Sequence, residues 1–217
     1  MARDGVVLAE GVYRESRSHT ASLPLLVERV FGDAGLALED LEGIAVSIGP
    51  GSFTGLRIGL ALAKGLAFAG GLPLVGVPTL EALAWVVDAE PGTTVCAALD
   101  ARKREVYAAL FAVEAEGPRR LTPDLALAPE ALAARLPRPC TVVGDAGEVY
   151  GEALGAHARL LPFATHHPRG GVIARLGAFQ QKLYLTPEEE MEKKRLQKLK
   201  LAGKDRIMEI LSRYRSH

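Results

Sequence analysis

Residues 49–59 read Gly49-Pro50-Gly51-Ser52-Phe53-Thr54-Gly55-Leu56-Arg57-Ile58-Gly59. A short apolar run, residues 44–48, precedes this stretch, and an apolar pattern at helical spacing follows it as far as Gly70. A short apolar run that stops at glycine and proline is typical of a buried strand entering a tight loop. The sequence therefore predicts a strand, this loop, and a long helix that begins near Thr54.

The loop has two physical interpretations, which the residues alone leave open. Glycines permit positive φ, and Ser52 and Thr54 can cap the exposed amides of the helix or leave them to an anion. The other interpretation is a tight turn that lets the helix pack closely on its sheet. Known nucleotide and nucleophile motifs fit poorly, because Thr54 replaces the third glycine of a dinucleotide loop and Pro50 replaces a glycine of the nucleophile elbow. The lysine of a phosphate-binding P-loop is also missing.

The flanking segments extend the pattern into a lobe. Residues 72–77 form a second apolar run, and Thr79 is placed to cap a helix over residues 80–87. Upstream, residues 23–31 have the apolar spacing of a helix, and residues 6–13 read as a kinked strand or short hairpin. Strand, helix, strand and helix in this order predict a parallel sheet with crossover helices.

Pro91-Gly92 marks the expected end of this lobe, giving a first lobe of residues 1–91 and a second of residues 92–185. The second begins with a predicted hairpin, residues 95–99 and 105–113, and continues as mixed α/β, with its last helix a candidate to return to the first lobe. Residues 186–217 carry nine Lys/Arg against six Asp/Glu, a net charge of +3. We expect a charged helical tail, either solvated or contacting a partner or RNA.

Composition limits the classes of function. Lys plus Arg equals Asp plus Glu at 26 each, so no global basic field drives nucleic-acid binding. Cys96 and Cys140 lie in apolar runs and are expected to be reduced core thiols. The N-terminus has no apolar signal core, and no run of about 18 apolar residues occurs. We therefore expect a cytoplasmic protein without contact to a membrane.

The loop and its surroundings resemble one known family. Residues 44–59, residues 74–84, Leu99-Asp100-Ala101-Arg102 with the following Glu105-Val106-Tyr107, and residues 173–176 together resemble the TsaB (YeaZ) family, over about residues 5–180. The resemblance implies an α/β, actin-like fold of two ribonuclease-H-like lobes with mixed sheets flanked by helices. It also implies a non-catalytic scaffold for the transferase TsaD, which with the ATPase TsaE attaches threonylcarbamoyl to tRNA.

The resemblance also implies where partners bind and that no cofactor is needed. In this family the first two helices form the partner surface, with a homodimer as an alternative to the TsaD heterodimer and tRNA bound only indirectly. On this sequence the expected surface comprises Leu23, Leu26, Val30, Leu60, Lys64 and Phe68.

Two departures from the family shape our expectations. Family members begin with two strands and an acidic phosphate-binding turn that precede the equivalent of Gly5, so we expect a misannotated or truncated start, with true loss of the strands as the alternative, and a sheet with exposed hydrogen-bonding edges. The charged tail is the second departure. The alternative function, an actin-like ATP-dependent phosphotransferase or ATPase, would need that acidic turn.

The sequence gives little support for a functional role of the other candidate groups. His166 and His167 are adjacent, and neighbours on a chain cannot both face one metal in regular structure. Asp100 and Glu105 flank three basic residues at a hairpin, where surface ion pairing is the expected arrangement. Asp145 follows a predicted strand at a position where α/β sheets often bind ligands, although the sequence identifies no partner for it.

Overall fold

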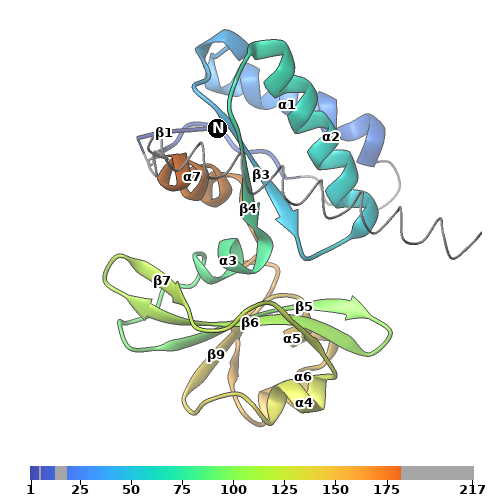
Figure 1. Ribbon diagram of the computed structural model, residues 1–217, viewed down its shortest axis with the longest axis vertical. Helices are drawn as coiled ribbons and strands as arrows, with labels where there is room; N and C mark the ends of the chain where they lie inside the picture. The colour runs from blue at the N-terminus through green and yellow to red at the C-terminus, as the bar shows by residue number, and fades with distance from the viewer. Residues whose placement is uncertain (5, 13–18, 182–217) are drawn as a thin grey trace, which may run out of the picture. The chain divides into compact units, whose positions relative to one another are not determined.

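The computed structural model describes residues 1–4, 6–12 and 19–181 (Figure 1). Met1–Gln180 form one compact unit. The predicted helices of the tail, from residue 186 onward, lie outside the described residues. Within Met1–Gln180 a small parallel sheet precedes residue 91 and a larger mixed sheet follows it.

Residues 44–70 form the predicted strand, loop and helix. Strand β3 (Ile44–Gly49) leads into helix α2 (Phe53–Gly70), which crosses over to strand β4 (Leu74–Pro78). The two strands are parallel, with Ile44 opposite Leu74 and Ser47 opposite Val77. Helix α3 (Thr79–Ala84) follows β4 directly. The predicted order is confirmed, and α2 begins one residue earlier than expected.

Helices cover both faces of the β3–β4 pair. Helix α2 packs against β3, and Leu60 and Ile48 line a small cavity between them. Helix α7 (Gly170–Gln181) approaches so closely that a Cβ on Gly177 would lie 2.5 Å from the Cβ of Ala45. Figure 1 shows α2 and α7 on opposite sides of the β3–β4 pair. The pair is thus the middle layer of a helix–strand–helix arrangement (Figure 1).

The N-terminal segment differs from the prediction. Strand β2 (Val6–Val7) pairs antiparallel with β1 (Ala2–Arg3), whereas Val12 is not in a strand and Tyr13 lies outside the described residues. Residues Ala9 and Glu10 are held by other contacts: the N-terminal ammonium donates to the Ala9 carbonyl at 2.5 Å, and Glu10 binds Arg169. Strand β2 therefore covers only the first two residues of the expected strand or hairpin, and Ala9 and Glu10 are held through polar groups.

Helix α1 (His19–Ala34) is longer at both ends than the predicted residues 23–31. It contacts α2, and a short 3₁₀ helix η1 (Leu38–Asp40) follows it. By length and composition α2 is apolar enough to cross a membrane. The helix packs on β3 and carries two charged residues, Arg57 and Lys64.

The second sheet has the strand order β10-β9-β5-β6-β7, and β8 also pairs with β6. Its strands are β5 (Thr94–Arg102), β6 (Glu105–Glu114), β7 (Gly117–Arg120), β8 (Leu125–Leu127), β9 (Cys140–Val143) and β10 (Arg159–Leu160). The short helices are α4 (Pro129–Ala133), α5 (Ala146–Val149) and α6 (Gly151–Gly155). The antiparallel β5–β6 hairpin confirms the prediction, and β5–β9 is parallel.

The largest core lies on the two faces of this sheet. Leu132 and Leu154 pack on one face together with Cys96 and Cys140, whereas Leu80 and Phe111 pack with the other. Both cysteines are free and buried, as expected. Burial raises the pKa of the Cys140 thiol to about 11, so it stays protonated at neutral pH.

Candidate functional site

The glycine loop is a tight turn closed by its own cap. The Ser52 hydroxyl accepts a hydrogen bond from the Gly55 amide at 3.3 Å, and the Leu56 amide donates to the Ser52 carbonyl at 2.9 Å. Gly49 has φ of +104°, which a side chain rarely permits. A Cβ there would also lie 3.1 Å from the Leu56 side chain. These contacts favour the packing interpretation of the loop, with Ser52 rather than Thr54 as the cap.

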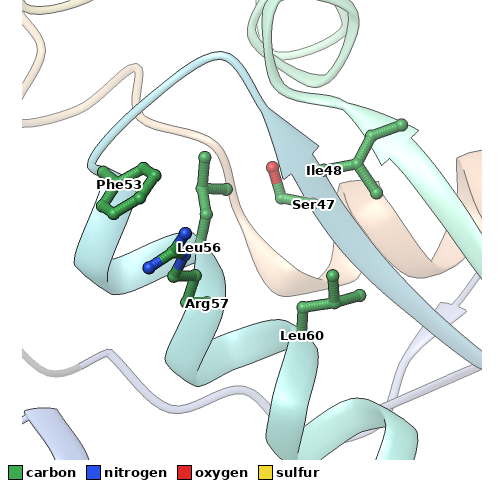
Figure 2. Close-up of a pocket in the computed structure, with 6 residues that line it drawn as sticks. All are labelled: Ser47, Ile48, Phe53, Leu56, Arg57 and Leu60. Carbon is green, nitrogen blue, oxygen red and sulfur yellow. The ribbon is translucent and has the colours of Figure 1, made fainter. Parts of the chain in front are cut away.

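A small apolar cavity lies where the loop meets β3 (Figure 2). Its volume is about 140 Å³, and it is lined by Ser47, Ile48, Phe53, Leu56, Arg57 and Leu60. The Arg57 guanidinium carbon lies 3.7 Å from the centre of the Phe53 ring, a cation–π contact. Phe53 and Arg57, one turn apart on α2, thus join the loop to the cavity.

The six residues expected to bind a partner differ in how far the rest of the chain covers them. Leu26 and Val30 on α1 lie against Gly11, where an added Cβ would be 2.5 Å and 3.1 Å from their side chains. Leu60 lines the β3 cavity, and Leu23 is half-buried. Lys64 and Phe68 are exposed. Helical spacing places residues on a stripe, but it does not say which neighbour already covers part of that stripe.

Helices α1 and α2 nevertheless present large apolar side chains to solvent. Phe68 is 91% exposed, Phe53 68% and Leu25 65%. Within α2 only Ala63 and Ala67 are buried, although most of the helix is apolar. Sequence reasoning missed Leu25 as a surface residue because it belongs to the same apolar run as Leu26. An apolar helix surface of this kind is typical of a protein-binding site.

Asp145 has a partner that the sequence did not identify. The Asp100 amide donates to Asp145 Oδ1 at 2.8 Å, and the Tyr150 hydroxyl donates to Asp100 Oδ1 at 3.0 Å. Burial raises the pKa of Asp145, against the opposing effect of that amide. Asp100 also pairs with the Arg102 guanidinium at 3.4 Å, as expected for this hairpin, although the Asp100 side chain is mostly buried. The cluster ties β5 to the residues that follow β9.

The two adjacent histidines make separate contacts. His166 Nδ1 lies 2.8 Å from the Thr165 hydroxyl, whereas His167 packs edge-on against the Phe163 ring. His167 Nε2 is buried without a hydrogen-bond partner. Among the described residues, no group of three or more His, Cys, Asp or Glu side chains is close enough to hold a metal ion.

Comparisons with known proteins agree on one family. The model of the family "TsaD: tRNA N6-adenosine threonylcarbamoyltransferase" matches residues 8–139. The tRNA threonylcarbamoyladenosine biosynthesis protein TsaB of Escherichia coli is 41% identical over 102 residues, 46% of this chain and 44% of that protein. A tRNA N6-adenosine threonylcarbamoyltransferase of Cereibacter sphaeroides is 56% identical over 62 residues, 29% of this chain and 17% of the transferase.

The fold comparison covers more of the chain. The structure of YeaZ from Pseudomonas aeruginosa superposes with a TM-score of 0.65 and 30% identity, over 77% of this chain and 80% of that one. In sequence, by contrast, the chain spans less than half the length of the curated relatives described above. The actin-like α/β fold expected from the sequence is therefore confirmed by structure.

Proposed function

Because the chain belongs to the TsaD family, and within it to the YeaZ (TsaB) proteins, we propose that it is an accessory subunit for threonylcarbamoyladenosine modification of tRNA. Relatives named for tRNA threonylcarbamoyladenosine biosynthesis support the pathway. Their matched regions are partial, so the role of the whole protein is inferred from the surface of this chain.

The proposal is based mainly on the exposed apolar surface of α1 and α2. A Phe68 side chain that is 91% exposed, near the end of a helix with only two buried residues, contributes almost nothing to the chain's own core. The same side chain can contribute strongly once a second protein removes it from water. The proposed partner is a TsaD-type transferase that packs on this surface, centred on Lys64 and Phe68.

Further partners follow from the same role. A TsaE-type ATPase would join the wider complex, and a second copy of the chain would compete with the transferase for the apolar surface. The balanced charge of the chain supports indirect rather than direct binding of tRNA. Relatives that modify tRNA support a cytoplasmic location, in which α2 is covered by protein rather than lipid.

A catalytic role is the less favoured candidate. The match to a Cereibacter sphaeroides transferase is strong over 62 residues but covers 17% of that enzyme, so it does not carry the enzyme's activity to this chain. Asp100 and Asp145 are neighbours in the fold, and the carboxylates of both accept hydrogen bonds from backbone amides. An actin-like phosphotransferase would need free carboxylates to position a metal with its nucleotide.

Reconstitution tests the proposal. Unmodified tRNA would be incubated with threonylcarbamoyl-adenylate, a TsaD-type transferase and a TsaE-type ATPase, with and without this chain, and the modified nucleoside would be measured. We expect modification only when the transferase and this chain are both present. Modification by this chain alone, or equal modification without it, would contradict the proposed role.

A further inference from the structure

The connection between strands β7 and β8 leaves a cavity beside β6. Strand β7 ends at Arg120 and β8 begins at Leu125, and the two strands pair with different parts of β6. Between these parts, the Leu110 amide of β6 donates to the side-chain hydroxyl of Thr122 at 3.0 Å instead of to a backbone carbonyl. Pro123 follows and has no N–H with which to pair. A side chain, rather than backbone, therefore joins this part of the connection to β6.

The cavity has a volume of about 340 Å³ and lies between β6, this connection and helix α4. Figure 1 shows α4 on the side of the larger sheet away from α3. Its walls include the apolar side chains of Ala108, Leu110, Leu125 and Leu132. Leu132 also belongs to the core on that face of the sheet. Since an apolar cavity of about 150 Å³ can bind benzene, this one has room for a larger apolar group.

Two polar side chains at the cavity indicate the chemistry of a ligand. The Arg135 guanidinium is exposed and forms no ion pair with any other described residue. Asp124, next to the cavity in sequence, is already paired with Arg120 at 2.6 Å. The Thr122 hydroxyl accepts from the Leu110 amide, and the described part of the chain supplies no acceptor for its own proton. A cation and a hydroxyl donor beside an apolar cavity are complementary to a carboxylate with an apolar body.

We propose that this cavity binds a small carboxylate with an apolar body, such as a short-chain fatty acid. The apolar body fills the cavity, and the carboxylate binds Arg135 and the Thr122 hydroxyl. Arginine suits this role because its planar guanidinium can bind both oxygens of a carboxylate at once. The site includes no residue of α1 or α2, so it does not depend on the proposed function.

Hexanoate and its uncharged analogue hexanamide test the proposal by NMR titration of the full chain. We expect saturable binding of hexanoate, with the largest shift changes at the amides of Leu110 and Thr122, and binding of hexanamide that is about fivefold weaker or more. Arg135→Gln should make the two affinities equal, because it removes the cation and keeps the apolar walls. Arg104→Gln, at the exposed β5–β6 hairpin, is the matched control and should keep the preference for hexanoate.

A second pair of variants tests the cavity itself. Leu125→Trp places a larger side chain in the wall and should abolish binding of both ligands. Leu121→Trp makes the same change at an exposed residue that does not line the cavity, and it should bind as wild type does. Thermal unfolding would establish that both variants are folded.

Three results would overturn the proposal. The first is no saturable binding of hexanoate by the wild-type chain, and the second is a preference for hexanoate that Arg135→Gln leaves unchanged. The third is binding that appears only after residues 187–217 are removed, since the natural occupant would then be the tail of the chain. No transferase is present in these measurements, so their failure leaves the proposed accessory role untouched.

Discussion

Arg169 binds the carboxylate of Glu10 through Nε at 2.8 Å, although 159 positions separate the two residues in the chain. The Gly171 amide, in the first turn of α7, donates to the same carboxylate at 3.0 Å. Glu10 therefore fastens the N-terminal segment to the helix that lies on β3. An anion at the start of a helix is also favoured by the helix dipole.

This contact makes stability depend on pH. Burial alone would raise the pKa of Glu10, but the Gly171 amide and Arg169 outweigh it, and the pKa is lowered. The stabilisation is then present above the ordinary pKa of a glutamate and is lost as the pH falls through the lowered value. Glu10→Gln should reduce the free energy of unfolding by about 1–2 kcal/mol at pH 7. The difference from wild type should shrink in acid.

Urea denaturation at several pH values checks this expectation. Glu116→Gln is the control, because Glu116 is exposed and forms no hydrogen bond or ion pair that the described structure shows. An equal loss from both substitutions, or a Glu10→Gln effect that is constant across pH, would refute the role of the Glu10 carboxylate.

The raised pKa of Asp145 predicts the opposite dependence of stability on pH. Its pKa is raised mainly by burial, so the folded state favours the protonated acid and loses stability as the pH rises from the unfolded pKa through the raised value. Asp145→Asn keeps an oxygen for the Asp100 amide and removes the buried charge, so it should be at least as stable as wild type at pH 7. Asp145→Ala leaves that amide without an acceptor and should cost about 1–3 kcal/mol. Thermal unfolding of the two variants checks this explanation. Equal losses of stability in Asp145→Asn and Asp145→Ala would contradict it.

Gly144 is the glycine whose replacement should be most damaging. Its φ is +120°, and an added Cβ would overlap the backbone carbonyl of Ala98. We expect Gly144→Ala to lower the free energy of unfolding by about 3 kcal/mol or more, since backbone cannot move aside. Gly65→Ala, in an open position on α2, should be neutral or stabilising by up to about 1 kcal/mol. A Gly144→Ala protein as stable as wild type would contradict the geometry.

Local structure was easier to predict from the sequence than contacts between residues far apart in the chain. Residues 44–78 showed their strand–loop–helix–strand pattern because apolar runs and glycines are local signals. No local pattern links Glu10 with Arg169, and the partner of Asp145 is a backbone amide, which every residue carries. The partner surface was predicted only as a set of helical positions. The structure adds that Leu26 faces Gly11 whereas Phe68 faces solvent.

The charged tail gives a separate prediction. Its apolar residues are sparse, so it can bury little surface, and we expect a chain ending at residue 186 to stay folded and to bind the transferase. The basic excess should contribute about 1 kcal/mol to tRNA affinity at low salt. Comparison of the shortened and full chains by thermal unfolding, partner binding and tRNA retention checks this. A large fall in Tm or loss of partner binding would show that the tail belongs to the fold or the interface.

The proposed accessory role requires a TsaD-type transferase to bind the α1–α2 surface. Isothermal titration with wild type, Phe68→Glu and the control Leu121→Glu tests it directly, because Phe68 and Leu121 are both exposed, on helix α2 and after strand β7 respectively. We expect tight binding by wild type and the control, and a loss of about 2 kcal/mol or more in Phe68→Glu, whose charge would be buried unpaired. Undiminished binding by a folded Phe68→Glu protein would contradict it.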